Sequence, residues 1–339
     1  MQVLKAKNLK KVVFFGTGGT ISGLSGDSND VLNYKAGLVR VGDLAQSALA
    51  VGSQAQEFEP IYEQIAQIDS KDMVFSVWQK LLERLLHWSS DPQVEGFLIT
   101  HGTDTIEETA FFLSLVTRQW STLPTIALTC AMRPASAKDA DGPQNLRDAT
   151  ALVLNPEWRR NGVVVVCAGQ VHSGACIQKV FSDRLDAFSS LPNDPLGLIE
   201  GGVAVKLNGA FKAKNTTPNV CLKQATTEQV LSAKTWPWVE IVQNYANNTG
   251  AIVNALVGFV QPDAQTLAGL VIAGTGIGTV SEDLLEALQL AKQRGVLIWQ
   301  STRCAFAQVK LKEGTDICDF HGLSPVKARI ALILHLLAQ

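Results

Sequence analysis

An apolar run that ends abruptly at glycine constrains the fold of this chain most. Residues 12–15 are Val-Val-Phe-Phe, and residues 16–23 read GTGGTISG. β-Branched and aromatic residues without alternation are typical of a strand buried on both faces, as in a parallel sheet. Open α/β sheets bind ligands beyond the carboxyl ends of such strands, so the glycine-rich turn is a candidate site. We consider Thr20, within this turn, a candidate nucleophile.

Two other interpretations of this turn have to be weighed. Glycine after a buried strand is common turn chemistry, and a threonine there more often caps a helix or turn than attacks a substrate. The sequence matches neither of two common nucleotide-binding motifs. No GxxxxGK[ST] string occurs, and the GxGxxG pattern begun by Gly16 and Gly18 has Ile21 at its third glycine.

A second stretch, residues 96–109, repeats the pattern as GFLITHGTDTIEET. Residues 97–100 form a buried-strand run, and residues 101–104 form the turn after it. Two parallel strands that end in this way predict that Thr20 and Thr103 face one crevice. His101 could serve as a general base, but a lone histidine at a strand end is more often a structural residue, and we do not assign it a catalytic role.

Helix signals follow both turns. Thr105 and Glu108 spell a capping box that opens an amphipathic helix over residues 106–118. Ser70 is well placed to cap a helix over residues 74–88. The polar segment 25–41, with Tyr34 in its middle, is more typical of a flap beside a site than of a simple connector.

The order of the remaining patterns predicts a two-domain α/β protein. A larger domain, residues 1–206, holds a parallel or mixed sheet flanked by helices, and a smaller parallel α/β domain covers residues 236–339. A Gly-, Pro- and Asn-rich linker, residues 207–235, separates them. Further strands are expected over 58–68, 126–130, 163–168, 239–243, 269–273 and 296–300, and further helices over 41–50, 145–154, 251–259, 281–294 and 325–337.

Composition excludes several classes of function. The chain has 339 residues, 46% of them hydrophobic and 18% charged, with a formal net charge of -2 and no basic runs, so nucleic acid is not expected as a partner. The start lacks a signal-peptide pattern, and the late apolar run 330–337 is too short to span a bilayer. We expect a cytoplasmic protein whose six cysteines, none in a CxxC pair, are reduced thiols.

Several strings together give the chain a family resemblance. FGTGGTISG (15–23) and THGTDTIEET (100–109) carry it, with AMRP (131–134), ADGPQN (140–145), NYAN (244–247) and PVKAR (325–329). The chain resembles bacterial-type L-asparaginases, amidohydrolases with a threonine nucleophile, across essentially its whole length. One glycine-rich loop would be weak support, whereas two spaced hydroxyl motifs with these strings are specific.

The resemblance implies an acyl-enzyme mechanism and a set of catalytic residues. It makes Thr20 the nucleophile and Tyr34 its hydrogen-bonding partner, and it groups Thr103, Asp104 and Lys179 as a second cluster. A threonine hydroxyl is a weak nucleophile that needs a neighbour to accept its proton. From the residues alone, Lys179 would be read as an ordinary solvated lysine.

The resemblance also implies how the substrate is bound. Ser70 and Asp104 would bind the α-amino and α-carboxylate ends of L-asparagine, and the main-chain carbonyl of Ala131 would receive the leaving amide nitrogen. Lys71 stands where the family's periplasmic enzymes usually have a glutamine that touches the substrate. Glu313 is a loose match to an acid that the family borrows from a neighbouring subunit.

The part of the site that the family completes with residues of a neighbouring subunit departs from the family pattern here. In the loop AGTGIGT, Thr279 replaces the usual asparagine, with Ile277 nearby. The family forms dimers of dimers, so a homo-oligomer is expected. No metal and no organic cofactor are expected, and neither is a membrane partner.

Two functions remain open at this point. The first is hydrolysis of L-asparagine to L-aspartate and ammonia, with minor glutaminase activity. The second is a non-hydrolytic amino-acid sensor or an amidotransferase subunit on the same fold.

Overall fold

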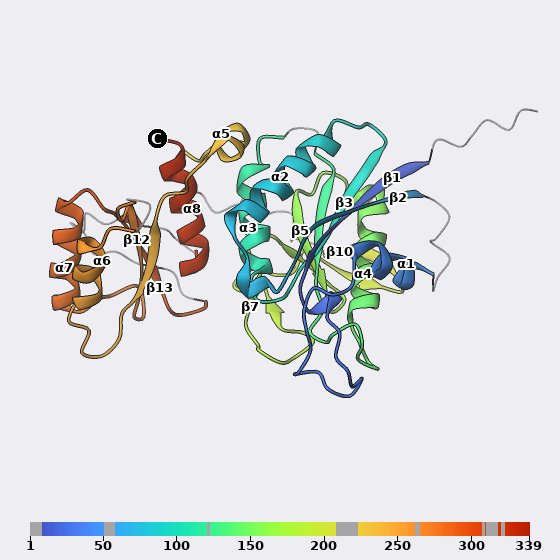
Figure 1. The fold of residues 1–339 in the computed structure, drawn as a ribbon, viewed down its shortest axis with the longest axis horizontal. Helices are drawn as coiled ribbons and strands as arrows, with labels where there is room; N and C mark the ends of the chain where they lie inside the picture. Colours follow the sequence, from blue (N-terminus) through green and yellow to red (C-terminus); the bar gives the residue numbers. More distant parts are fainter. Residues whose placement is uncertain are drawn as a thin grey trace, which may run out of the picture. The chain divides into compact units, whose positions relative to one another are not determined.

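The structure, a computed structural model, describes residues 9–50, 58–120, 123–207, 223–261, 265–306, 309, 318–319 and 323–339. Contacts divide the chain into two compact units, Met1–Thr216 and Thr217–Gln339, and Figure 1 shows an α/β arrangement in each. The two-domain α/β class predicted from sequence is therefore confirmed.

A mixed eight-stranded sheet forms the centre of unit 1, in the order β10-β9-β6-β5-β4-β3-β1-β2. The strands β2, β1, β3, β4 and β5 are parallel, and β6, β9 and β10 add an antiparallel edge. Their bounds are β1 (Lys10–Gly18), β2 (Phe58–Ile68), β3 (Val94–Thr100), β4 (Thr125–Thr129), β5 (Val163–Cys167), β6 (Gln170–Ser173), β9 (Gly197–Glu200) and β10 (Val203–Lys206). A separate ribbon pairs β7 (Gln178–Lys179) with β8 (Phe188–Ser189).

Helices cover both faces of this sheet (Figure 1). One face packs on α1 (Val41–Leu49) and α4 (Gly142–Leu154), and the other packs on α2 (Phe75–Ser89) and α3 (Ile106–Val116). Consecutive residues of a strand point to opposite faces, so an unbroken apolar run serves both layers. Phe14 belongs to the α1 and α4 core, whereas Phe15 stacks on Phe97 at a centroid distance of 6.1 Å.

Unit 2 holds a smaller parallel sheet in the order β11-β12-β13-β14. Its elements are β11 (Val239–Gln243), β12 (Gly269–Gly274), β13 (Leu297–Thr302), β14 (Cys318–Asp319), α5 (Thr227–Ser232), α6 (Ala251–Gly258), α7 (Glu282–Gln293) and α8 (Pro325–Leu337). Helices α6 and α7 share one apolar core with the sheet, and α8 contacts β11, β12 and β13. Ser281 caps α7, because its hydroxyl accepts a hydrogen bond from the Leu284 amide at 3.4 Å.

The predicted domain limits at residues 206 and 236 stay predictions. Within the predicted linker 207–235, residues 208–222 lie outside the described part of the chain. The described part contains α5, whose Thr226 and Gln229 form a reciprocal capping box. This helix contacts α8, so the end of the linker segment is part of unit 2.

Two local predictions about helix starts are wrong. Ser70 does not cap the helix after it, because α2 begins after Val74, and Ser70 instead opens the short 3-10 helix Ser70–Asp72. Thr105 does precede α3, but its side chain makes no cap and donates to the Ser70 carbonyl at 2.7 Å. In both cases a tertiary contact has replaced the local capping that the pattern suggested.

Candidate active site

The candidate site lies at the point where the strand order of the large sheet reverses. β1 has β2 on one side and β3 on the other, so the carboxyl ends of β1 and β3 are the point where an α/β sheet binds ligands. Gly18 and Gly19 have φ of 108° and 80°, and a Cβ atom at Gly19 would lie 2.3 Å from the Gly102 Cα atom. Glycine is therefore required for the two turns to pack backbone against backbone.

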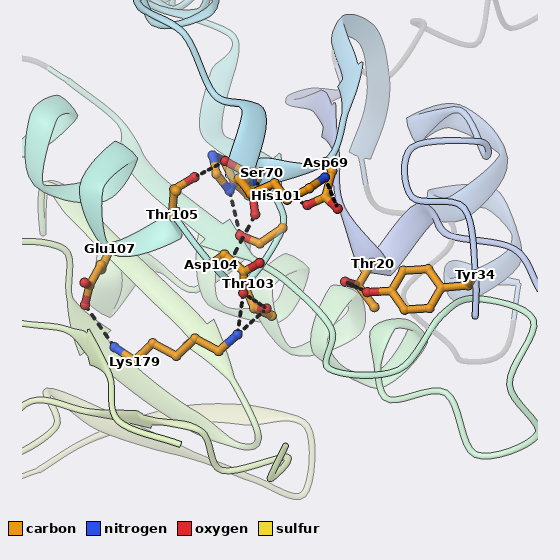
Figure 2. Close-up of polar contacts among 12 residues, drawn as sticks. Thr20, Tyr34, Asp69, Ser70, His101, Thr103, Asp104, Thr105, Glu107 and Lys179 are labelled. Atoms are coloured by element: carbon orange, nitrogen blue, oxygen red, sulfur yellow. Dashed lines mark hydrogen bonds and ion pairs between the residues drawn. The ribbon is translucent and has the colours of Figure 1, made fainter. Parts of the chain in front are cut away.

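Thr20 follows this contact and pairs with the flap. Its Oγ1 atom lies 2.7 Å from the Tyr34 hydroxyl, and the Thr20 residue is 8% exposed. Leu24 and Lys35 exchange two backbone hydrogen bonds, of 3.0 and 2.9 Å, which close the base of the flap and hold Tyr34 over Thr20. Figure 2 shows the phenol ring directed at the threonine. The flap thus supplies a hydroxyl group to the candidate nucleophile.

The neighbouring turn carries a second hydroxyl that contacts an amine. Lys179 donates from Nζ to Thr103 Oγ1 at 2.9 Å and forms an ion pair with Asp104 Oδ1 at 2.6 Å. The Lys179 side chain is 18% exposed and that of Asp104 is 54% exposed. The lysine is therefore mostly enclosed, while the carboxylate also faces solvent. Figure 2 shows the Thr20 pair and the Thr103 cluster on these adjacent turns.

Ser70 fastens the end of β2 to the Thr103 turn. Its buried hydroxyl accepts a hydrogen bond from the Asp104 amide at 3.2 Å, and its carbonyl accepts the Thr105 hydroxyl. A Cβ atom at Gly102 would lie 2.4 Å from the Ser70 oxygen. The Ser70 side chain therefore lies against the candidate site and also holds its backbone.

His101 is structural, as the sequence suggested. Its Nδ1 atom contacts the Gly102 carbonyl at 2.8 Å, and its Nε2 atom contacts Thr109 Oγ1 at 2.9 Å, which in turn accepts from the Trp78 indole at 2.9 Å. Because a carbonyl only accepts, this network assigns the proton to Nδ1 of a neutral imidazole. Burial lowers the pKa of His101 to about 4. These hydrogen bonds hold the turn at residues 101–104 in place.

The backbone around Ala131 is fixed by two residues that sequence reasoning did not select. The Asp141 carboxylate accepts the Met132 and Arg133 amides, both at 3.0 Å. Asn145 donates to the Cys130 carbonyl at 2.9 Å. Asp141 and Asn145 both belong to the ADGPQN string, whose match to a family signature was the available signal.

Ala131 follows β4, the strand beside β3, and a Cβ atom at Gly142 would lie 2.8 Å from the Ile21 side chain and 3.3 Å from the Ala131 side chain. The turns after three neighbouring strands, β1, β3 and β4, therefore carry Thr20, Thr103 and Ala131 at one edge of the sheet. Parallel strands bring residues distant in sequence to one edge, which is how this fold builds a site.

Comparisons with known proteins agree with this geometry. Residues 11–211 match the family model described as Asparaginase, N-terminal, and residues 238–339 match the Glutaminase/Asparaginase C-terminal domain. The chain belongs to the asparaginase family. Its asparaginase signatures at residues 15–23 and 100–109 are the two turns described above.

Relatives of the asparaginase family match almost the full chain. L-asparaginase 2 of Escherichia coli (strain K12) is 32% identical over 97% of this chain and 89% of that protein. Glutaminase-asparaginase of Pseudomonas fluorescens biotype A is 32% identical over 97% of this chain and 86% of its own length. A crystal structure titled Probable Cytoplasmic L-asparaginase from Campylobacter jejuni superimposes with a TM-score of 0.83, at 31% identity, covering 96% and 95% of the two chains.

For the remaining residues that the family resemblance selected, the structure gives less information about a role in the site. Lys71 is exposed, and its amine pairs with Asp69 at 3.0 Å and Asp72 at 3.1 Å, so two carboxylates compensate its charge. Glu313 lies outside the described residues. Ile277 and Thr279 belong to unit 2, in the loop after β12.

Two further observations bear on the other sequence expectations. The cysteine side chains that the structure describes, Cys130, Cys167, Cys176 and Cys304, are free thiols. Among the described ranges, every helix is too short or too polar to cross a bilayer.

Proposed function

We propose that this protein hydrolyses L-asparagine to L-aspartate and ammonia through a covalent intermediate on Thr20. The observation that carries the proposal is the pairing of two hydroxyls on adjacent turns with groups that can exchange protons. Thr20 lies 2.7 Å from the Tyr34 hydroxyl, and Thr103 lies 2.9 Å from the Lys179 amine. A passive binding site does not need either pairing, which favours the enzyme over the amino-acid sensor.

In the first half of the reaction the Thr20 oxygen forms a bond to the side-chain amide carbon of asparagine. The hydroxyl proton passes through its neighbours to the amide nitrogen, the carbon–nitrogen bond breaks, and ammonia leaves. In the second half a water adds to the resulting ester, and its proton is relayed through the Thr103 hydroxyl, which the Lys179 amine orients, to the Thr20 oxygen. The ester bond to Thr20 then breaks, which releases aspartate and restores the hydroxyl.

The same geometry offers contacts to the ends of the substrate. The half-exposed Asp104 carboxylate can take the substrate ammonium in a charge-assisted hydrogen bond, with Ser70 and Lys71 toward the α-carboxylate. The Ala131 carbonyl would receive the leaving nitrogen. Backbone N–H groups of the two turns would stabilise the oxyanion, an effect of roughly 2.7 to 4 kcal/mol per donor.

Three finer properties belong to this proposal. Minor glutaminase activity is supported by relatives named Glutaminase-asparaginase. A cytoplasmic location is supported by the solved structure titled as a probable cytoplasmic enzyme. A homo-oligomer in which a second copy brings Glu313 to the site rests on the family resemblance alone.

Ammonia release from purified protein tests the proposal. We expect turnover of L-asparagine, slower turnover of L-glutamine, and loss of both in Thr20→Ala, while Thr20→Ser keeps measurable activity because it retains a hydroxyl. Rapid quenching followed by peptide mass spectrometry should find an aspartyl ester on the peptide that contains Thr20. Full activity of Thr20→Ala would refute the nucleophile. Thermal stabilisation by aspartate without ammonia release would support the sensor instead.

A further inference from the structure

Lys179 stands on a ribbon that is not part of the large sheet. Its strand β7 has two residues and pairs only with β8 among the described strands. In that ribbon Val180 donates its amide to the Ala187 carbonyl at 2.8 Å. Amides alternate in direction along an antiparallel strand, so the Lys179 amide points away from the ribbon. The ribbon by itself therefore leaves the position of the lysine backbone weakly defined.

The outward amide is taken by a carboxylate of the helix that carries the site. Lys179 N donates to Glu107 Oε2 at 2.9 Å, and Glu107 lies in the first turn of α3. At its other end the same lysine donates to Thr103 and Asp104. Figure 2 shows the side chain stretched between these two anchors. Both ends of one lysine are thus held by residues of a single segment, 103–107.

We propose that Glu107 is a positioning residue, which fixes the Lys179 backbone so that the amine reaches the Thr103 hydroxyl. The inference rests on the proposed function, in which the Thr103–Lys179 pair moves a proton. A hydrogen bond to a carboxylate is about twice as strong as one between neutral groups. Displacement of a reacting group by about 1 Å can cost on the order of 100-fold in rate, so this anchor matters for chemistry.

Glu107 could instead act only through its charge, because an acidic side chain in the first turn stabilises a helix. Three variants separate the two roles. Glu107→Gln loses the charge but keeps an oxygen that can accept the Lys179 amide, and Glu107→Ala loses both. Glu108→Ala removes the same charge one residue further along the first turn of α3.

Steady-state ammonia release from L-asparagine is measured for the three variants and the natural protein. We expect Glu107→Ala to lower kcat by about 10-fold to 100-fold with KM changed less than threefold, since the step lost is chemical. Glu107→Gln should keep at least a third of the kcat, and Glu108→Ala should match the natural protein. A kcat within twofold in Glu107→Ala, or equal losses in Glu107→Ala and Glu107→Gln, would overturn the proposal.

Hydrogen–deuterium exchange of peptides that span residues 177–181 gives a readout that needs no turnover. The Lys179 amide should exchange at least tenfold faster in Glu107→Ala and within about threefold of the natural rate in Glu107→Gln. If the natural protein released no ammonia, the proposed function would fail while the exchange data still decided whether Glu107 holds Lys179. Unchanged exchange in Glu107→Ala would overturn the positioning role directly.

Discussion

The two sheets of this protein end in similar strings and put them to different uses. In unit 1, β1 runs into GTGGT at residues 16–20, and in unit 2, β12 runs into GTGIGT at residues 274–279. Both are parallel strands followed by glycines and hydroxyls, which predicts the same kind of turn. From the sequence pattern alone, the two loops are equally good candidates for a site.

The partners of the hydroxyls separate the two loops. Thr20 and Thr103 contact Tyr34 and Lys179, side chains with exchangeable protons that come from other elements. In unit 2, Thr275 and Thr279 bond to each other at 3.0 Å, and each also bonds to the other's carbonyl. The two hydroxyls of the unit 2 loop thus bond within that loop. A hydroxyl turn becomes a candidate catalytic site when distant residues supply its partners.

The same isosteric change in both loops provides the strongest contrast. Thr103→Val removes the hydroxyl that Lys179 contacts, so we expect kcat for asparagine to fall by about 100-fold to 10,000-fold, the range for a lost acid–base contribution. Thr279→Val removes a hydroxyl bonded within its own loop, and we expect kcat within about threefold of the natural value. Steady-state ammonia release measures both.

A large loss in Thr279→Val would break the comparison. It would show that a second copy of the chain brings this loop to the site, as the family resemblance implies. Sedimentation of both variants, compared with the natural protein, checks that neither change acts by altering the assembly.

Glycine positions offer a second contrast, in stability. A methyl group at Gly19 would lie 2.3 Å from Gly102 backbone atoms, whereas a methyl group at Gly276 meets no atom within 4 Å. Both glycines have positive φ, at 80° and 52°. Gly276→Ala should therefore cost only the conformational strain, about 1 to 2 kcal/mol, while Gly19→Ala should cost at least about 4 kcal/mol.

Denaturant unfolding of the full chain, followed by far-UV circular dichroism, compares the two glycine variants. Equal losses would mean that the contact between the Gly19 and Gly102 turns relaxes easily. The packing of these turns would then be a poor basis for the site geometry described above.

Sequence reasoning predicted the framework of the site because that framework is local. The apolar runs 12–15 and 97–99 and the glycines after them gave the strands β1 and β3 and their turns. Adjacency of Thr20 and Thr103 then followed from a general rule about parallel sheets. This part needed neither a relative nor a structure.

The partners could not be predicted in that way. Tyr34 is 14 residues from Thr20, and Lys179 is 76 residues from Thr103, so no local pattern links them. Without the family resemblance, Lys179 reads as a solvated lysine. The Ser70 cap and the Thr105 capping box failed for the related reason that the two residues bond to each other across the fold. Tertiary contacts outcompeted the local preference at both positions.

The buried hydrogen-bond chain beneath the unit 1 turn predicts a dependence of stability on pH. His101 is fully buried with a pKa of about 4, below its usual value near 6.5, so the unfolded chain binds this proton more readily than the folded one. The contribution of neutral His101 to the free energy of unfolding is therefore complete above about pH 6.5 and decreases as the pH falls toward 4. Between pH 7 and pH 5 this one group should cost about 2 kcal/mol.

Comparison with His101→Gln isolates this contribution. Glutamine is uncharged at both pH values, and its amide offers a donor and an acceptor to Gly102 and Thr109, so the variant should lose about 2 kcal/mol less than the natural protein between pH 7 and pH 5. Denaturant unfolding at the two pH values measures this difference, in which the titration of other groups, such as the buried Asp148 with its raised pKa, cancels. Equal losses in the two proteins would mean that His101 accepts a proton in the folded state. The neutral imidazole assigned to the hydrogen-bond network between Gly102 and Thr109 would then be wrong.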